Sequence, residues 1–110
     1  MLINCVAYQD GQKLADIDIA NISDWLAKPN CFIWVAMRDA SMQELQSMQE
    51  EFDLHPLAIE DAARGHQRPK IEEYGETVFI VMQLLEMHKG EVQVGDVAVF
   101  VGRNFVLSVR

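Results

Sequence analysis

The stretch that decides the fold is His55-Pro-Leu-Ala-Ile-Glu-Asp-Ala-Ala-Arg-Gly-His-Gln-Arg-Pro-Lys-Ile-Glu-Glu-Tyr74. It predicts a short helix at its start, because Pro56 suits the first helical turn. Gly65 suits the left-handed position just past a helix end, so the helix is expected to stop there. Pro69 favours an extended backbone in the residue before it, and a strand is therefore expected to begin near Lys70.

The identity and spacing of the residues in this stretch are more specific than a helix and a strand require. It closely resembles the signature of the CorA family of magnesium and cobalt transporters, which has the form HPLA-(I/L)-ED-A, then HQRPK-(I/V)-E, then Y. The resemblance covers residues 31–110 well and residues 1–30 loosely. Similar flanking segments are residues 32–38, 41–54, 78–83 and 97–110.

The resemblance implies a fold and a setting. The family's cytoplasmic domain is an α/β/α sandwich, so we expect an α/β fold with short helices on the faces of a mixed, largely antiparallel sheet. The full protein would be a homopentamer that moves Mg²⁺, with Co²⁺ as a second ion. The chain would then lie on the cytoplasmic side of the inner membrane, as part of an integral membrane protein.

Hydrophobic patterning agrees with a mixed sheet. Ser41-Met-Gln-Glu44 has the form of a capping box, and Met42, Leu45, Met48 and Phe52 then fall on one helical face. An apolar run over residues 31–37 predicts a central strand covered on both faces. A bulge or a break in the strand is expected at Gly95. The remaining expected elements are strands over residues 2–8, 13–19, 78–87, 91–101 and 105–110, a short helix capped by Ser23, and a helix near residues 56–64.

Composition fits one small domain. The chain has 110 residues, half of them hydrophobic, and a formal net charge of −8. That charge argues against nucleic acid and against an anionic membrane surface as partners, since both favour basic patches. It suits a domain that attracts cations, or a domain that is merely kept soluble by its charge. Cys5 and Cys31 lie in apolar runs without metal-ligand spacing, which favours two buried thiols in a reducing cytosol.

Membrane-spanning helices are not expected within this sequence. A transmembrane helix needs about 20 consecutive apolar residues, and the longest apolar run here covers only residues 31–37. No secretory signal pattern is visible. We therefore expect residues 1–110 to be a single soluble cytoplasmic domain, truncated at its C-terminus, without the stalk and membrane helices of the family. As this fragment it is expected to be a monomer or a weak dimer.

Glu60 and Asp61 are the candidate metal ligands. Successive helical residues point about 100° apart, so the two carboxylates do not form one clamp. Glu60 can pair with Arg64 four residues later, which leaves Asp61 the freer acid and Glu60 the weaker candidate. The residues alone favour ordinary solvated acids. The resemblance implies instead that Asp61 helps bind a regulatory Mg²⁺ between subunits, weakly in this fragment, with Co²⁺ or Zn²⁺ as alternative ions.

Other chemistry finds little support in the sequence. His55, His66 and His88 share no metal-ligand spacing, and His55 is expected to mark the helix entry. No nucleophile has a base beside it and no phosphate-binding loop is present, so an enzyme is not expected. The sequence thus predicts a regulatory, metal-sensing cytoplasmic domain of a CorA-like transporter. The alternatives are a domain of a ZntB-like zinc transporter and a stand-alone soluble binding or adaptor domain of the same fold.

Overall fold

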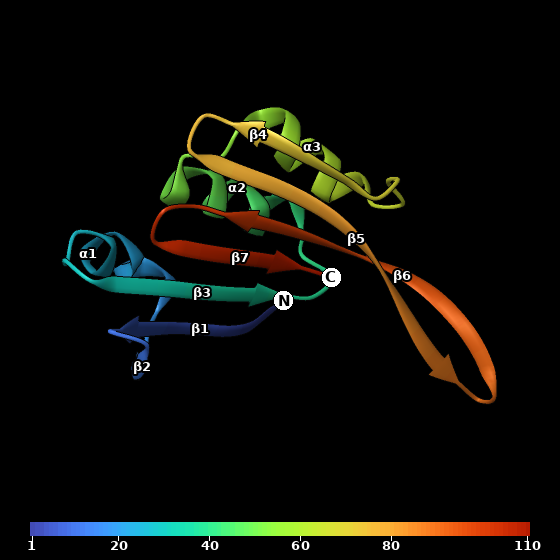
Figure 1. Cartoon of the computed structure of the whole chain (residues 1–110), viewed down its shortest axis with the longest axis horizontal. Helices are drawn as coiled ribbons and strands as arrows, with labels where there is room; N and C mark the ends of the chain where they lie inside the picture. Colours follow the sequence, from blue (N-terminus) through green and yellow to red (C-terminus); the bar gives the residue numbers. More distant parts are fainter.

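Seven strands form one sheet in the computed structural model, which describes all 110 residues (Figure 1). Their order across the sheet is β2-β1-β3-β7-β6-β5-β4. The strands are β1 (Leu2–Gln9), β2 (Gln12–Asp16), β3 (Cys31–Met37), β4 (Lys70–Tyr74), β5 (Thr77–His88), β6 (Glu91–Val101) and β7 (Phe105–Val109). The helices are the 3-10 turn η1 (Ile19–Asn21), α1 (Ile22–Leu26), α2 (Met42–Phe52) and α3 (Pro56–Arg64).

The sheet is mixed and largely antiparallel, as predicted. Only β3 and β7 pair in parallel, with Ile33 opposite Phe105 at one end of the register and Met37 opposite Val109 at the other. Every other neighbouring pair is antiparallel. The segment between β3 and β4 carries α2 and α3, so the predicted helical crossover is present.

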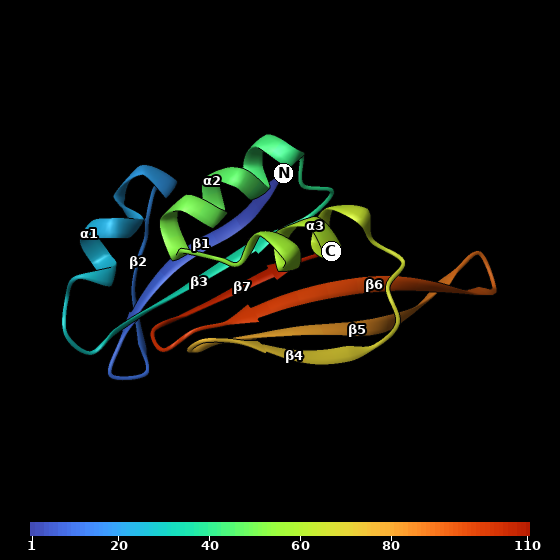
Figure 2. The same ribbon diagram turned by 90° about the horizontal axis from the view of Figure 1, so that it is seen from above.

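All three α-helices lie on the same side of the sheet (Figure 2). The α/β class is therefore confirmed, and within residues 1–110 the helices form a single layer on the mixed sheet. Burial along β3 alternates strictly, with Cys31, Ile33, Val35 and Met37 buried and the residues between them half-buried. The expectation that β3 is covered equally on both faces was wrong, because helices cover only one face.

The core lies between the helices and the sheet. It includes Leu45 and Met48 of α2 and Ile59 of α3, which pack in one cluster with Phe79 and Phe100 of the sheet. These two phenylalanines are opposite each other in the β5–β6 register, with ring centroids 4.8 Å apart. Because burial of such side chains supplies most of the stabilisation of a small domain, this cluster fixes how α2 and α3 sit on the sheet.

Helix α2 begins at the predicted capping box. The Ser41 hydroxyl accepts a hydrogen bond from the Glu44 N–H at 3.1 Å, and the Glu44 carboxylate accepts one from the Ser41 N–H at 3.0 Å. The helix ends at Asp53, whose backbone is left-handed with φ of 53°. Met42 was expected on the buried face, but it is 49% exposed because it occupies the first helical turn, beyond the reach of the core.

Three further expectations were wrong in detail. Helix α1 begins at Ile22, so Ser23 lies inside it and Asn21 is the N-cap. The second strand ends at Asp16 and a 3-10 turn begins at Ile19, where the sequence had favoured a longer strand. Gly95 causes neither a bulge nor a break, because it stays in regular register opposite Leu84.

Strands β5 and β6 continue past the sheet as a two-stranded ribbon (Figure 1). Beyond the Gln83–Asp96 pair, the apolar side chains of this ribbon have no helix over them. The strongly exposed ones are Leu85, Met87, Val92 and Val94.

The capping box generates a stability prediction. Replacing Ser41 with alanine removes the acceptor for the Glu44 N–H, and should lower the free energy of unfolding by about 1 kcal/mol. Urea denaturation followed by circular dichroism measures this change. Ser47→Ala on the same helix is the matched control, because Ser47 only donates to the Gln43 carbonyl within the helix. Its effect should stay within about 0.5 kcal/mol. An equal loss for both variants would contradict the capping role.

Candidate functional site

Helix α3 is bounded as the sequence predicts. Pro56 occupies the first turn, and the His55 Nδ1 accepts a hydrogen bond from the Leu57 N–H at 3.1 Å. His55 is therefore a helix-entry residue, as expected. At the other end Gly65 has φ of 67°, a conformation that glycine adopts without strain, and its N–H donates to the Asp61 carbonyl at 3.1 Å.

Strand β4 lies against α3 through every second residue. Lys70, Glu72 and Tyr74 are half-buried, while Ile71 and Glu73 are exposed. Because side chains alternate between the faces of a strand, the first three project toward the face that carries the helices. The Tyr74 ring stacks on the His55 imidazole, with ring centroids 4.4 Å apart. The two ends of the sequence signature are thus in direct contact.

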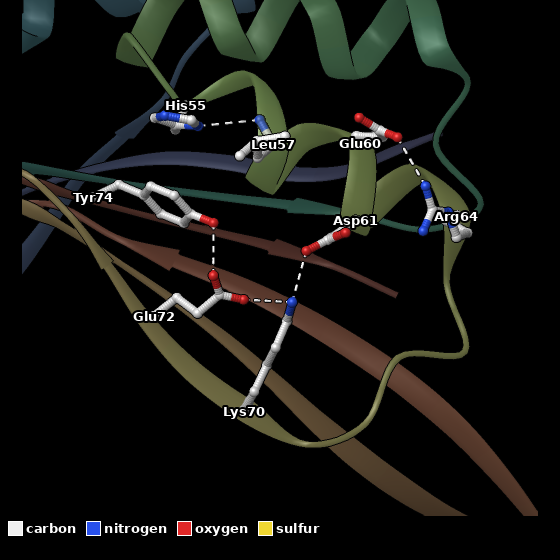
Figure 3. A network of polar contacts seen from close by, with 8 residues as sticks. All are labelled: His55, Leu57, Glu60, Asp61, Arg64, Lys70, Glu72 and Tyr74. Atoms are coloured by element: carbon white, nitrogen blue, oxygen red, sulfur yellow. Dashed lines mark hydrogen bonds and ion pairs between the residues drawn. The ribbon is translucent and has the colours of Figure 1, made fainter.

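A chain of polar contacts joins α3 to β4 (Figure 3). The Lys70 Nζ donates to the Asp61 Oδ2 at 2.7 Å and forms a second ion pair with the Glu72 Oε1. The Tyr74 hydroxyl donates to the other Glu72 oxygen at 2.8 Å. The side chains of Asp61 and Lys70 are 20% and 29% exposed, so water reaches both members of the central pair. One ammonium group therefore bridges two carboxylates from different elements.

The electrostatics of the group follow from these contacts. Hydrogen bonds to Asp61 and then to Glu72 raise the pKa of Lys70 well above its usual range, which keeps the ammonium charged. The Lys70 ammonium, followed by the Tyr74 hydroxyl, lowers the pKa of Glu72. The hydrogen bond to the Glu72 carboxylate in turn raises the pKa of Tyr74. All of these directions favour one state, with Lys70 and Glu72 ionised and Tyr74 neutral.

The structure corrects the expectation for Asp61. The Glu60 carboxylate pairs with the Arg64 guanidinium at 2.8 Å, as predicted from their spacing. Asp61 was expected to be the freer acid, but it is also paired. Its partner Lys70 is less exposed than Arg64, the partner of Glu60. The spacing rule sees only partners within one helix, whereas Lys70 reaches Asp61 from the following strand. The pairing of Lys70 with Asp61 is thus the contact that sequence reasoning missed, although both residues stand inside the same signature.

Asp61 also borders a cavity of about 330 Å³. Asp39 and Asp96 line the same cavity, together with His66 and Arg110. The His66 backbone N–H donates to the Asp96 carboxylate. Three aspartates and two basic residues therefore line the cavity beside Asp61.

The donor set limits what this chain can hold by itself. No group of three or more His, Cys, Asp and Glu side chains lies close enough together to hold a metal ion. Asp61 and Glu72 do converge on one cation, the Lys70 ammonium. Mg²⁺ takes one or two carboxylates and keeps several waters, so this pair has the donor chemistry for a weak hydrated site. The histidines belong to no such group.

Comparison with known sequences identifies relatives whose names refer to metal ion transport. The chain is 37% identical over 68 residues to a protein named cobalt/magnesium transport protein CorA from Thermotoga maritima, a match of 60% of this chain and 19% of that protein. It is 33% identical over 75 residues to the putative metal ion transporter YfjQ from Bacillus subtilis, a match of 68% of this chain and 23% of that one. The chain therefore spans about a fifth of the length of these relatives.

Comparison with solved structures shows the same fold. The CorA magnesium transporter from Methanocaldococcus jannaschii matches 99% of this chain and 32% of its own, with a TM-score of 0.71 and 12% identity. The soluble domain of CorA from Methanocaldococcus jannaschii matches 97% of this chain and 41% of its own, with a TM-score of 0.65 and 13% identity. Full-length CmaX matches 99% of this chain and 34% of its own, with a TM-score of 0.72 and 15% identity.

No helix in the chain has the length and apolar character needed to cross a bilayer. The match to the family model runs from residue 29 to residue 110, which includes α2, α3 and the whole α3–β4 contact. The sequence resemblance noted at the outset is therefore confirmed: the chain belongs to the family of CorA-like Mg²⁺ transporter proteins.

Proposed function

We propose that this chain is the N-terminal cytoplasmic domain of a Mg²⁺/Co²⁺ transporter and acts there as a regulatory, metal-sensing domain, not as an enzyme. The observation that carries this proposal is the α3–β4 unit. Its signature residues bring a water-accessible carboxylate, Asp61, to the edge of a cavity that Asp39 and Asp96 also line. The names of the relatives, which refer to cobalt, magnesium and metal ion transport, support divalent cations as the cargo.

The rest of the transporter would follow this domain. The chain spans only 19% and 23% of the length of the two relatives. We infer that residues 1–110 form one N-terminal domain of a longer polypeptide, that stalk and membrane helices follow it, and that five copies assemble around a pore. Contact with the inner membrane would be made only through those later helices.

Sensing would depend on charge. A domain with a net charge of −8 repels its copies, and cations bound between copies would reduce that repulsion and stabilise the closed assembly. Asp61 would supply the carboxylate of this chain, with Glu60 as the weaker candidate, and a neighbouring copy would supply the other ligands. Mg²⁺ would be the regulatory ion, because a site with few carboxylates and many waters suits it. Falling cytosolic Mg²⁺ would then loosen the assembly and favour opening.

Substitution of Asp61 tests this role in the full-length transporter. Asp61→Asn removes the charged ligand and keeps the side-chain shape, so the Mg²⁺ concentration that halves the flux should rise severalfold while maximal transport is retained. Flux into vesicles loaded with graded internal Mg²⁺ measures this concentration. Glu60→Gln is the matched control at the neighbouring helix position, and it should change the Mg²⁺ concentration that halves the flux by less. If the wild-type and Asp61→Asn proteins close at the same Mg²⁺ level, the regulatory role of Asp61 is wrong.

The assembly state of residues 1–110 is a second prediction. Because the net charge opposes association and the proposed stalk helices are outside this sequence, the chain should sediment as a monomer or weak dimer at micromolar concentration. Analytical ultracentrifugation without divalent ions measures this directly. A tight pentamer under those conditions would mean that the domain itself drives assembly.

A further inference from the structure

The Lys70 ammonium occupies a position that is electrostatically a cation site. The Asp61 Oδ2 approaches it from α3 at 2.7 Å and the Glu72 Oε1 approaches it from β4. The hydrogen bond from the Tyr74 hydroxyl to the second Glu72 oxygen holds that carboxylate in place. Two carboxylates on different elements therefore converge on one positive charge, and that charge belongs to a flexible side chain of the same polypeptide.

We propose that Lys70 is a tethered competitor for the divalent ion at Asp61. Its ammonium fills the cation position between Asp61 and Glu72, so an ion that binds Asp61 must first displace it. The regulatory meaning of this competition rests on the proposed function, whereas the competition itself is a property of residues 1–110. In this proposal, Lys70 determines the ion concentration at which Asp61 becomes available to bind a divalent ion.

Displacement is physically accessible. The Lys70 side chain is 29% exposed, so water reaches it. Its ammonium forms ion pairs with Asp61 and Glu72 only, and its other contact is the Phe79 ring, whose centroid is 5.9 Å away. A lysine on a four-carbon stem can rotate into water without any backbone change. The vacated position would carry two carboxylate charges, and no other cation forms an ion pair with Asp61 or Glu72, which favours a divalent ion.

The tether decides the balance between the two cations. A group linked through a few bonds competes at an effective concentration of about millimolar or higher. A free divalent ion must therefore exceed a threshold before it replaces the ammonium, and Mg²⁺ also loses part of its strongly held water shell on binding a carboxylate. This competition would keep the two carboxylates insensitive to low ion concentrations and let them respond to higher ones.

Removal of the ammonium is the direct test, with Mn²⁺ as the probe ion and electron paramagnetic resonance to count free Mn²⁺. Lys70→Met in the 110-residue chain should bind Mn²⁺ at least about tenfold more tightly than wild type, a change equal to about 1.4 kcal/mol. Arg103→Gln is the matched control, since it removes one positive charge from the exposed Arg103–Glu76 pair, which includes neither candidate ligand. Adding Asp61→Asn to Lys70→Met should abolish the gain. Mg²⁺ should compete with Mn²⁺ for the new site.

Two results would overturn the proposal. One is unchanged Mn²⁺ affinity in folded Lys70→Met, and the other is an equal gain of Mn²⁺ affinity in Arg103→Gln, which would reflect net charge alone. Circular dichroism establishes folding, and Lys70→Gln, which keeps a hydrogen-bond donor for both carboxylates, replaces the methionine variant if that variant unfolds.

The two proposals can fail separately. A gain of Mn²⁺ binding in Lys70→Met, together with normal closure by Mg²⁺ in the Asp61→Asn transporter, would leave the competition standing and reject the proposed function. Altered closure of the Asp61→Asn transporter, without a gain of Mn²⁺ binding in Lys70→Met, would support the proposed function and reject the competition.

Discussion

One ammonium group, that of Lys70, ties helix α3 to the edge strand β4, and the geometry of the candidate site depends on it. Gly65 and Pro69 only allow the chain to leave the helix and return as a strand. The contacts that hold the two elements in register are the Asp61–Lys70 pair and the stack of His55 on Tyr74. The sequence signature can therefore be understood as a set of contacts. Its spacing places the N-cap of α3 against the last residue of β4, and Asp61 in the last turns of α3 against the first residue of β4.

Local features of this fold were predictable from sequence because their causes are local. The capping box at Ser41 and the proline and glycine boundaries of α3 depend on residues a few positions apart. The partner of Asp61 was not predictable in the same way. Lys70 lies nine residues away, beyond a turn, and only the tertiary structure brings the two side chains together. The predicted bulge or break at Gly95 was wrong for the opposite reason. A local signal was overridden by the long antiparallel pairing of β5 with β6, which includes the glycine without distortion.

The arrangement of layers has a consequence for the domain as a whole. The helices cover the face of the sheet that carries Ile33 and Leu107, and these residues are fully buried. Trp34 and Val106, on the other face, are only half-buried. The family resemblance implied helices on both faces, and residues 1–110 build the sheet and one helical layer. The cavity beside Asp61 lies at the junction of α3 with that sheet.

The central claim is that Asp61 and Lys70 bind each other in the folded protein, and a double-mutant cycle on the free energy of unfolding tests it most directly. The cycle compares wild type, Asp61→Asn, Lys70→Met and the double variant by urea denaturation. Because both side chains are partly exposed, water screens the pair, and the predicted coupling energy is about 0.5–1 kcal/mol in favour of the wild-type pair. Additive effects of the two substitutions, with a coupling energy of zero, would contradict the account.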